Sequence, residues 1–152
     1  MILKFLNVAL VLIYAAGSGL WVSTGDSWYR SLTAPSWQPP DWVFGTIWPY
    51  NFIFLGIVGW QVISNLGNSW GKVWLSIFAV TIAFALTWAN LFYVKHNIGG
   101  ASIALSLVAF FTVPLLAIAF KTNYKYGLLL TPYQLWVTTA SFLSFSYYKL
   151  NK

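Results

Sequence analysis

The chain has 152 residues, of which 59% are hydrophobic and 7% are charged, and its mean hydropathy is +0.71. A soluble globular domain carries about 25% charged residues, so this composition excludes that class and indicates a single integral membrane domain, residues 1–152. The net charge of +6 comes from eight Lys or Arg against Asp26 and Asp41. Because the basic residues are scattered, we expect no nucleic-acid partner. Without cysteine, disulfides and thiolate chemistry are excluded.

Five apolar segments follow one another along the chain. Each is close to the ~20 residues that cross ~30 Å of hydrocarbon as a helix. None shows the alternation of barrel strands, and a backbone in lipid must satisfy its own hydrogen bonds, so helices are favoured. The sequence therefore predicts an all-α, multi-pass membrane bundle of five transmembrane helices. These are residues 5–22, 44–63, 73–94, 98–120 and 128–148.

The first segment has some features of a signal peptide. Lys4 precedes an apolar stretch that ends in small residues at Ala15, Ala16 and Gly17. We expect a retained helix, because the apolar stretch continues to Val22 and is longer than the usual hydrophobic region of a signal. Five spans would leave the two termini on opposite sides of the membrane.

Residues 23–43 form the one long connection, and they contain both acids, three prolines and several aromatic residues. A solvated linker seldom contains three Trp and a Tyr, so we expect a structured lid, although a position at the membrane interface would explain some of these rings. The aromatic residues are Trp28, Tyr29, Trp37 and Trp42.

The basic residues are expected to anchor helix ends among lipid headgroups. With five spans, the two sides of the membrane carry equal numbers, so charge indicates neither the orientation nor which membrane holds the chain. One side has Lys4, Lys72, Lys121 and Lys125, and the other has Arg30, Lys95, Lys149 and Lys152.

Two strings of residues at fixed spacing are unusual for an arbitrary membrane protein. The first lies in and after the long loop: Trp28-Tyr29, Leu32, the string Pro35 to Pro40 (PSWQPP), Phe44-Gly45 and Trp48. The second lies in the last segment: Leu130 to Trp136 (LTPYQLW), Ala140, Leu143 and Leu150-Asn151. Together with Trp88 and Phe92-Tyr93 of the third segment, they resemble the TspO family, also known as tryptophan-rich sensory proteins, translocator proteins or peripheral-type benzodiazepine receptors.

The resemblance implies five helices, a pocket below the first loop, and binding of porphyrins, haem, sterols and drug-like molecules. A tetrapyrrole would be a ligand, and no cofactor and no metal site are expected. The resemblance and the residue spacing together predict this set of ligand-binding residues: Trp28, Tyr29, Arg30, Pro39, Trp48, Asn51, Phe52, Trp88, Phe92, Trp136 and Ala140.

Helical spacing gathers aromatic residues on shared faces. The expected faces are Trp48, Asn51, Phe52 and Leu55; Phe84, Trp88, Leu91 and Phe92; and Pro132, Trp136, Thr139 and Leu143. Such rings either pack helix against helix or stack on a flat macrocycle, and the resemblance favours stacking for Trp48 and Trp136. Arg30 could pair with a propionate, or equally with a lipid headgroup.

Some positions depart from the family pattern and leave ligand preference open. Ala85 and Ser144 stand where relatives often have Asn, and Pro49 and Asn51 stand where relatives usually have apolar residues. His96 is the one histidine, and we interpret it as a loop or interfacial residue rather than a haem ligand.

Two further patterns are weaker. Leu143, Tyr147 and Lys149 match a loose sterol-recognition pattern that membrane boundaries produce routinely. Small residues four apart predict a homodimer through the third helix, with packing inside one chain as the alternative. They are Ala79 and Ala83, and Ala85 and Ala89.

The leading functional prediction is a membrane receptor or binding protein for tetrapyrroles and other hydrophobic ligands, with a sensory or regulatory role. A porphyrin or sterol transporter is one alternative, although the membrane segments contain no acid and no repeat. A porphyrin-degrading enzyme is the other. General acid–base catalysis lacks candidates, so Trp48 and Trp136 would have to act through redox chemistry.

Overall fold

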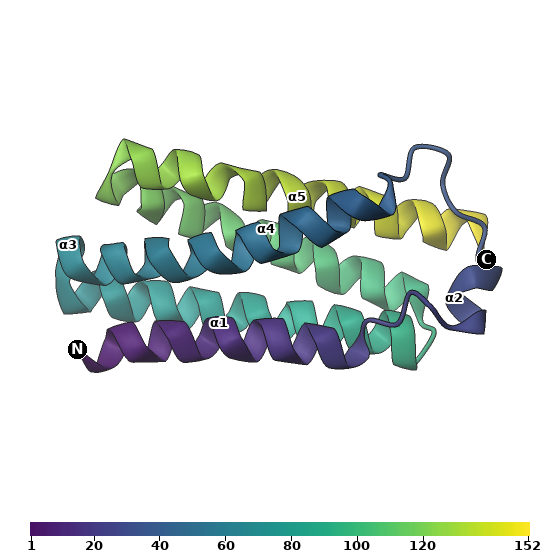
Figure 1. Ribbon diagram of the computed structural model, residues 1–152, viewed down its shortest axis with the longest axis horizontal. Helices are drawn as coiled ribbons and strands as arrows, with labels where there is room; N and C mark the ends of the chain where they lie inside the picture. Colours follow the sequence, from purple (N-terminus) through teal and green to yellow (C-terminus); the bar gives the residue numbers. More distant parts are fainter.

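The computed structural model describes residues 1–152 and contains helices and loops without strands. The long helices run side by side in an elongated bundle, with the N-terminus at one end and the C-terminus at the other (Figure 1). The all-α prediction is therefore confirmed. In chain order the elements are α1 (Ile2–Trp21), α2 (Ser27–Ser31), α3 (Asp41–Ala89), the π-helix η1 (Asn90–Val94), α4 (Ile98–Thr122) and α5 (Tyr124–Leu150).

Helix α3 consists of two limbs, residues 41–66 and 68–89, because the chain reverses at Gly67 (Figure 1). Gly67 has φ 82° and ψ −175°, a conformation that glycine adopts without steric cost and L-residues with a side chain rarely adopt. The sequence predicts a break between residues 63 and 73. The actual break is a single residue, because Ser64 and Asn65 continue the helix and bond their side chains to carbonyls one turn earlier.

Three helices are long and apolar enough to cross a membrane: Ile2–Trp21, Asp41–Val94 and Ile98–Thr122. The second of these includes both limbs of α3. Helix α5 is 27 residues long but contains polar residues along its whole length, such as Gln134, Thr138 and Ser141. Five long helical segments are thus present, which is consistent with the predicted count.

The core runs along the middle of the bundle, where α4 packs against both α3 and α5, and α1 packs against α3. Leu55, Val58, Trp74 and Phe78 are among its fully buried side chains. A second, smaller cluster lies near the C-terminal end of the bundle and includes Phe92 and Tyr147. We call this end, which carries α2 and the loop of residues 23–43, the lid end, and the opposite end, which contains Met1 and Gly67, the turn end.

Candidate functional site

A cavity of about 780 Å³ lies below the loop of residues 23–43. Its size falls within the range of pockets that hold drug-sized ligands. Most of its lining residues are hydrophobic, and the charged ones are Arg30 and Asp41, which both lie outside the core. The lining is therefore mainly apolar, and its one cation and one anion both belong to the segment of residues 23–43.

Aromatic rings from three elements form the cavity wall. Trp136 of α5 meets Phe44 edge to face at a centroid distance of 5.0 Å. On the first limb of α3, Trp48 stacks with Phe52 at 5.7 Å, and Tyr14 of α1 meets Phe52 edge to face at 5.2 Å. These rings line the cavity because Phe44, Trp48 and Phe52 recur every four residues on one helical face.

Two indole N–H groups of the cavity lining have no hydrogen-bond partner in the chain. They belong to Trp88 and Trp136, and both nitrogen atoms are buried. Trp136 as a whole is 8% exposed. A buried donor without an acceptor costs about 1–3 kcal/mol, so both groups favour a ligand that brings acceptor atoms.

The loop is attached to the bundle through α2. Asp26 caps this helix, its Oδ1 accepting from the backbone N–H of Tyr29 at 2.7 Å. The Trp28 ring stacks on His96 at a centroid distance of 3.9 Å and meets Phe92 edge to face. Trp28 therefore anchors the loop over the end of η1.

The C-terminal end of α5 holds the middle of the loop. Asn151 accepts from the Thr33 backbone N–H at 2.8 Å, and its Nδ2 donates to the Thr33 carbonyl at 3.0 Å. Further along the loop, the Tyr147 hydroxyl donates to Gln38 Oε1 and lies 3.4 Å from the Tyr29 hydroxyl. The loop is folded onto the bundle through side-chain contacts, as expected for a lid.

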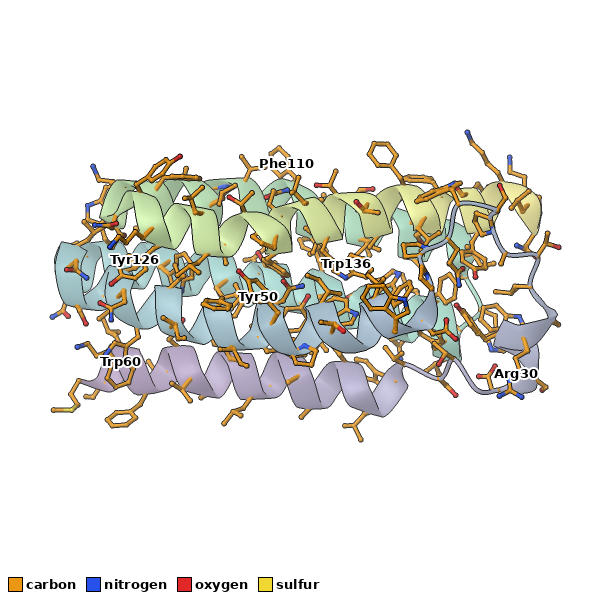
Figure 2. All side chains as sticks on the ribbon, turned by 45° about the horizontal axis from the view of Figure 1, so that its top comes forward. Arg30, Tyr50, Trp60, Phe110, Tyr126 and Trp136 are labelled. Carbon is orange, nitrogen blue, oxygen red and sulfur yellow. The ribbon has the colours of Figure 1, made fainter.

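Eight of the eleven predicted binding residues line the cavity, and Figure 2 shows one of them, Trp136, inside the bundle and another, Arg30, at its lid end. The eight are Tyr29, Arg30, Trp48, Phe52, Trp88, Phe92, Trp136 and Ala140. The other three lie elsewhere. Trp28 packs on His96, Pro39 is half-buried in the loop, and Asn51 is fully buried outside the lining.

Asn51 lies three residues from Trp48, but the face that it shares with Leu55 turns into the core, where both are 0% exposed. Neither polar atom of the Asn51 side chain has a hydrogen-bond partner in the chain. On α5, two of the four residues of the predicted face, Trp136 and Leu143, line the cavity. Ala140 lines the cavity and Thr139 does not.

Sequence reasoning missed several lining residues. On α5, continuing the spacing of Trp136, Ala140 and Leu143 by one more turn would have found Tyr147. Tyr93 lines the cavity next to Phe92 because η1 inserts an extra residue into the helical turn, with the Lys95 N–H bonded to the Asn90 carbonyl five residues earlier. No feature of the sequence predicts this extra residue.

Of the four positions that depart from the family pattern, two line the cavity. Ala85 and Ser144 both line the cavity, and the Ser144 hydroxyl lies 3.0 Å from that of Ser102 on α4. His96 is exposed, stacks on Trp28 and does not line the cavity.

Comparison with known proteins gives matches over almost the whole chain. The sequence matches the TspO/MBR family over residues 7–149. It is 31% identical over 153 residues to Protein CrtK of Rhodobacter capsulatus, covering 99% of this chain and 95% of that protein. It is 34% identical over 141 residues to the Tryptophan-rich protein TspO of Chlorobaculum tepidum, covering 90% of this chain and 87% of that protein. The Translocator protein of Homo sapiens is 28% identical over 137 residues, covering 89% of this chain and 81% of that protein.

The matched residues include the loop string that ends at Trp48 and the α5 string that contains Trp136. The resemblance inferred from these strings is confirmed by the match, and the long apolar helices agree with the membrane location it implies. This chain belongs to the TspO/MBR family of membrane proteins.

Proposed function

We propose that the chain is a membrane receptor that binds a tetrapyrrole, such as protoporphyrin IX or haem, in the cavity beneath the lid. The observation that carries the proposal is the cavity itself, with an aromatic wall and two buried indole donors. A flat macrocycle offers a π-face to Trp48 and Trp136, and each stacked ring contributes roughly 0.5–1.5 kcal/mol beyond burial. Sterols and drug-like molecules of similar size are secondary ligands of the same cavity.

Arg30 is the proposed partner of a ligand carboxylate. It lies on α2 in the lid and lines the cavity, while its side chain remains exposed. A propionate that reaches the cavity mouth would therefore meet a cation without being taken into the hydrocarbon. Asp41 lies in the same lining and would disfavour a second carboxylate beside it.

We also propose that five segments cross the membrane, namely α1, the two limbs of α3, α4 and α5. The termini lie at opposite ends of the bundle, as an odd number of spans requires (Figure 1). Four basic residues belong to each end, so positive charge gives no orientation. Reporter fusions at the two termini should report opposite sides of the membrane, and reports from the same side would contradict five spans.

A homodimer through the second limb of α3 is a further part of the proposal. Ala79 and Ala83 are exposed, whereas Ala85 and Ala89 are buried inside the chain at 3% and 0% exposure. The proposed interface is therefore restricted to the Ala79 and Ala83 face, where small side chains allow close helix approach. The variant Ala83→Leu should lower the oligomeric mass in detergent, with Ala16→Leu on α1 as the control.

The direct test is to titrate the purified protein with protoporphyrin IX, hemin and a sterol while tryptophan fluorescence is recorded. The proposal expects saturable quenching by the tetrapyrroles at lower concentration than by the sterol. Quenching that stays linear with every ligand, as for free N-acetyltryptophanamide in the same detergent, would contradict it.

Porphyrin degradation is the one alternative with a supporting observation. Trp48, Trp88 and Trp136 all line the cavity, so oxidisable rings would surround a bound macrocycle. Illumination of the protoporphyrin complex separates the two functions. A receptor releases the porphyrin with an unchanged absorption spectrum, whereas an enzyme releases a product with a different spectrum.

A further inference from the structure

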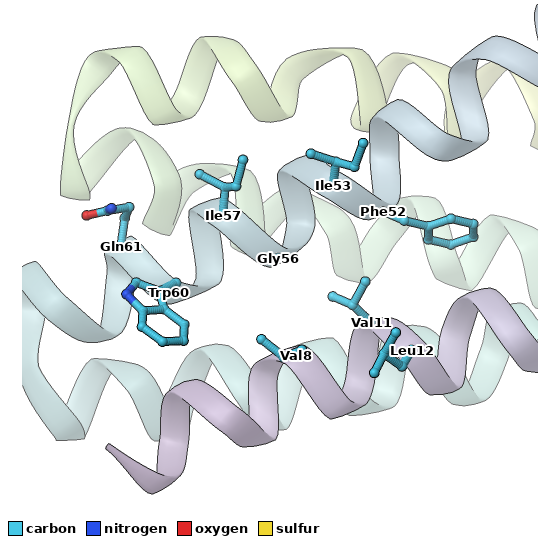
Figure 3. A pocket seen from close by; sticks show the side chains of 9 residues that line it. All are labelled: Val8, Val11, Leu12, Phe52, Ile53, Gly56, Ile57, Trp60 and Gln61. Carbon is cyan, nitrogen blue, oxygen red and sulfur yellow. The ribbon is translucent and has the colours of Figure 1, made fainter.

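A second hollow lies outside the ligand cavity, on the flank of the bundle between α1 and the first limb of α3 (Figure 3). This groove has a volume of about 370 Å³, and seven of its nine lining residues are hydrophobic. Leu12 and Ile53 on its two walls are 63% and 58% exposed. In a membrane, a groove with these walls faces the hydrocarbon.

Glycine leaves part of the groove without a side chain. Gly56 lines it, and a Cβ built there would meet only Val11 Cγ2, at 3.9 Å. The glycine is therefore not required by a close helix contact. Its consequence is space between the two helices, and a larger side chain at this position would fill that space.

The length of the groove corresponds to one leaflet. Trp60 and Gln61 lie at one end and Phe52 lies at the other (Figure 3). From residue 52 to residue 61 the helix rises about 14 Å at 1.5 Å per residue. This is close to half of the ~30 Å hydrocarbon thickness. The groove therefore has the length of one lipid acyl chain in one leaflet, and it runs from the turn end to about the middle of the membrane.

A cation lies at the outer end of the groove. Lys4 Nζ is 5.0 Å from the centre of the Trp60 ring, and Phe5 meets the same ring edge to face at 6.3 Å. Both acids of the chain, Asp26 and Asp41, belong to the lid end, so neither offsets this charge. A positive charge beside an apolar groove at the membrane boundary suits the phosphate of an anionic lipid.

We propose that this groove binds one acyl chain of an anionic phospholipid, with the lipid phosphate held at Lys4. The proposal rests on the membrane location of the chain and is independent of what the cavity binds. Phe52 lines both hollows, so the methyl end of the acyl chain would contact the residue that separates the groove from the cavity.

The test is native mass spectrometry of the detergent-purified full chain with added phosphatidylglycerol or phosphatidylcholine of identical acyl chains. The parent should retain phosphatidylglycerol about fivefold more than phosphatidylcholine, as expected for one basic residue near a headgroup with a net negative charge, because the phosphate of phosphatidylcholine is offset by its own choline cation. Lys4→Gln should abolish this preference. Lys121→Gln is the matched control, because Lys121 also lies over a tryptophan ring at the turn end, 5.1 Å from the centre of Trp70.

The binding of the acyl chain in the groove is tested by Gly56→Leu, which should lower retention of both lipids severalfold. Ala117→Leu, on the exposed face of α4, introduces the same side chain elsewhere and should retain both lipids. Should Gly56→Leu fail to fold, judged by helical circular dichroism, the two lysine variants still decide. Equal losses in Lys4→Gln and Lys121→Gln, or parent-like retention in a folded Gly56→Leu, would overturn the proposal.

Discussion

The turn end and the lid end of the bundle accommodate buried tryptophan in opposite ways. At the turn end, Trp74 is 0% exposed and its Nε1 donates to Asn7 Oδ1 at 2.9 Å. Asn7 in turn donates to the Gly56 carbonyl at 3.0 Å. At the lid end, Trp88 and Trp136 border the cavity, and their buried N–H groups have no acceptor in the chain.

Glycine accounts for part of the difference. A Cβ at Gly59 would lie 2.1 Å from Asn7 Oδ1 and 2.6 Å from Trp74 Nε1, so the turn end closes tightly around that polar pair. Trp136 has no such polar partner. Its ring meets the ring of Phe44 edge to face in the cavity wall. The same residue type is therefore hydrogen-bonded within the core at one end, and at the other its buried N–H has no partner in the chain.

The largest expected effect is on stability, from Trp74→Leu at the turn end. The substitution leaves a space and removes the donor to Asn7, so thermal unfolding in detergent should show a loss of roughly 2–4 kcal/mol. Trp70→Leu is the control, because Trp70 is 38% exposed, and it should cost less than about 1 kcal/mol. Equal melting temperatures for the two variants would show that the Trp74 contacts do not stabilise the fold.

A smaller effect is expected from loosening the lid. Asn151→Leu removes two hydrogen bonds to the Thr33 backbone, each worth about 0.5–1.5 kcal/mol. Protoporphyrin IX should then dissociate roughly tenfold faster, as measured by stopped-flow displacement. Ser146→Ala loses only a local bond to the Phe142 carbonyl and should leave the rate unchanged. An unchanged rate in Asn151→Leu would mean that the lid does not retain the ligand.

The smallest effect is expected at the exposed Arg30. Exposed ion pairs contribute about 0.2–1 kcal/mol, so Arg30→Gln should weaken protoporphyrin IX binding roughly two- to fivefold. The dimethyl ester of the porphyrin, which has no carboxylate, should bind both proteins equally, and Lys149→Gln should have no effect on either ligand. If Arg30→Gln weakened binding of the ester as much as binding of protoporphyrin IX, Arg30 would act through the fold of the lid.

The sequence predicts much of the fold, because hydropathy and length mark the helical segments and the aromatic loop marks the lid. The single-residue turn at Gly67 is narrower than the predicted gap, since Ser64 and Asn65 satisfy their own polar groups on the helix. The tryptophans are harder to assign. Spacing places Trp48 and Trp74 on helices, but the partner Asn7 lies 67 residues from Trp74 and cannot be identified from sequence.

The cavity was predicted through motif residues more than through helical faces. Trp48 and Trp136 belong to the two strings and both line the cavity, whereas the faces deduced from spacing also included Asn51 and Thr139, which do not. Spacing fixes the angle between side chains on one helix but not the direction in which that face points. The extra residue of η1, which brings Tyr93 to the cavity, changes the spacing itself.

The central claim is that the lid end is a ligand site and the turn end is core. The most direct test is the affinity for protoporphyrin IX of a double variant that carries Trp48→Leu and Trp136→Leu. Each stacked ring contributes roughly 0.5–1.5 kcal/mol beyond burial, so the double variant should bind at least about fivefold more weakly than the parent, and more weakly than either single variant. Trp70→Leu, at the turn end, should bind like the parent. Parent-like affinity in a folded double variant would contradict the account and leave both rings as packing residues.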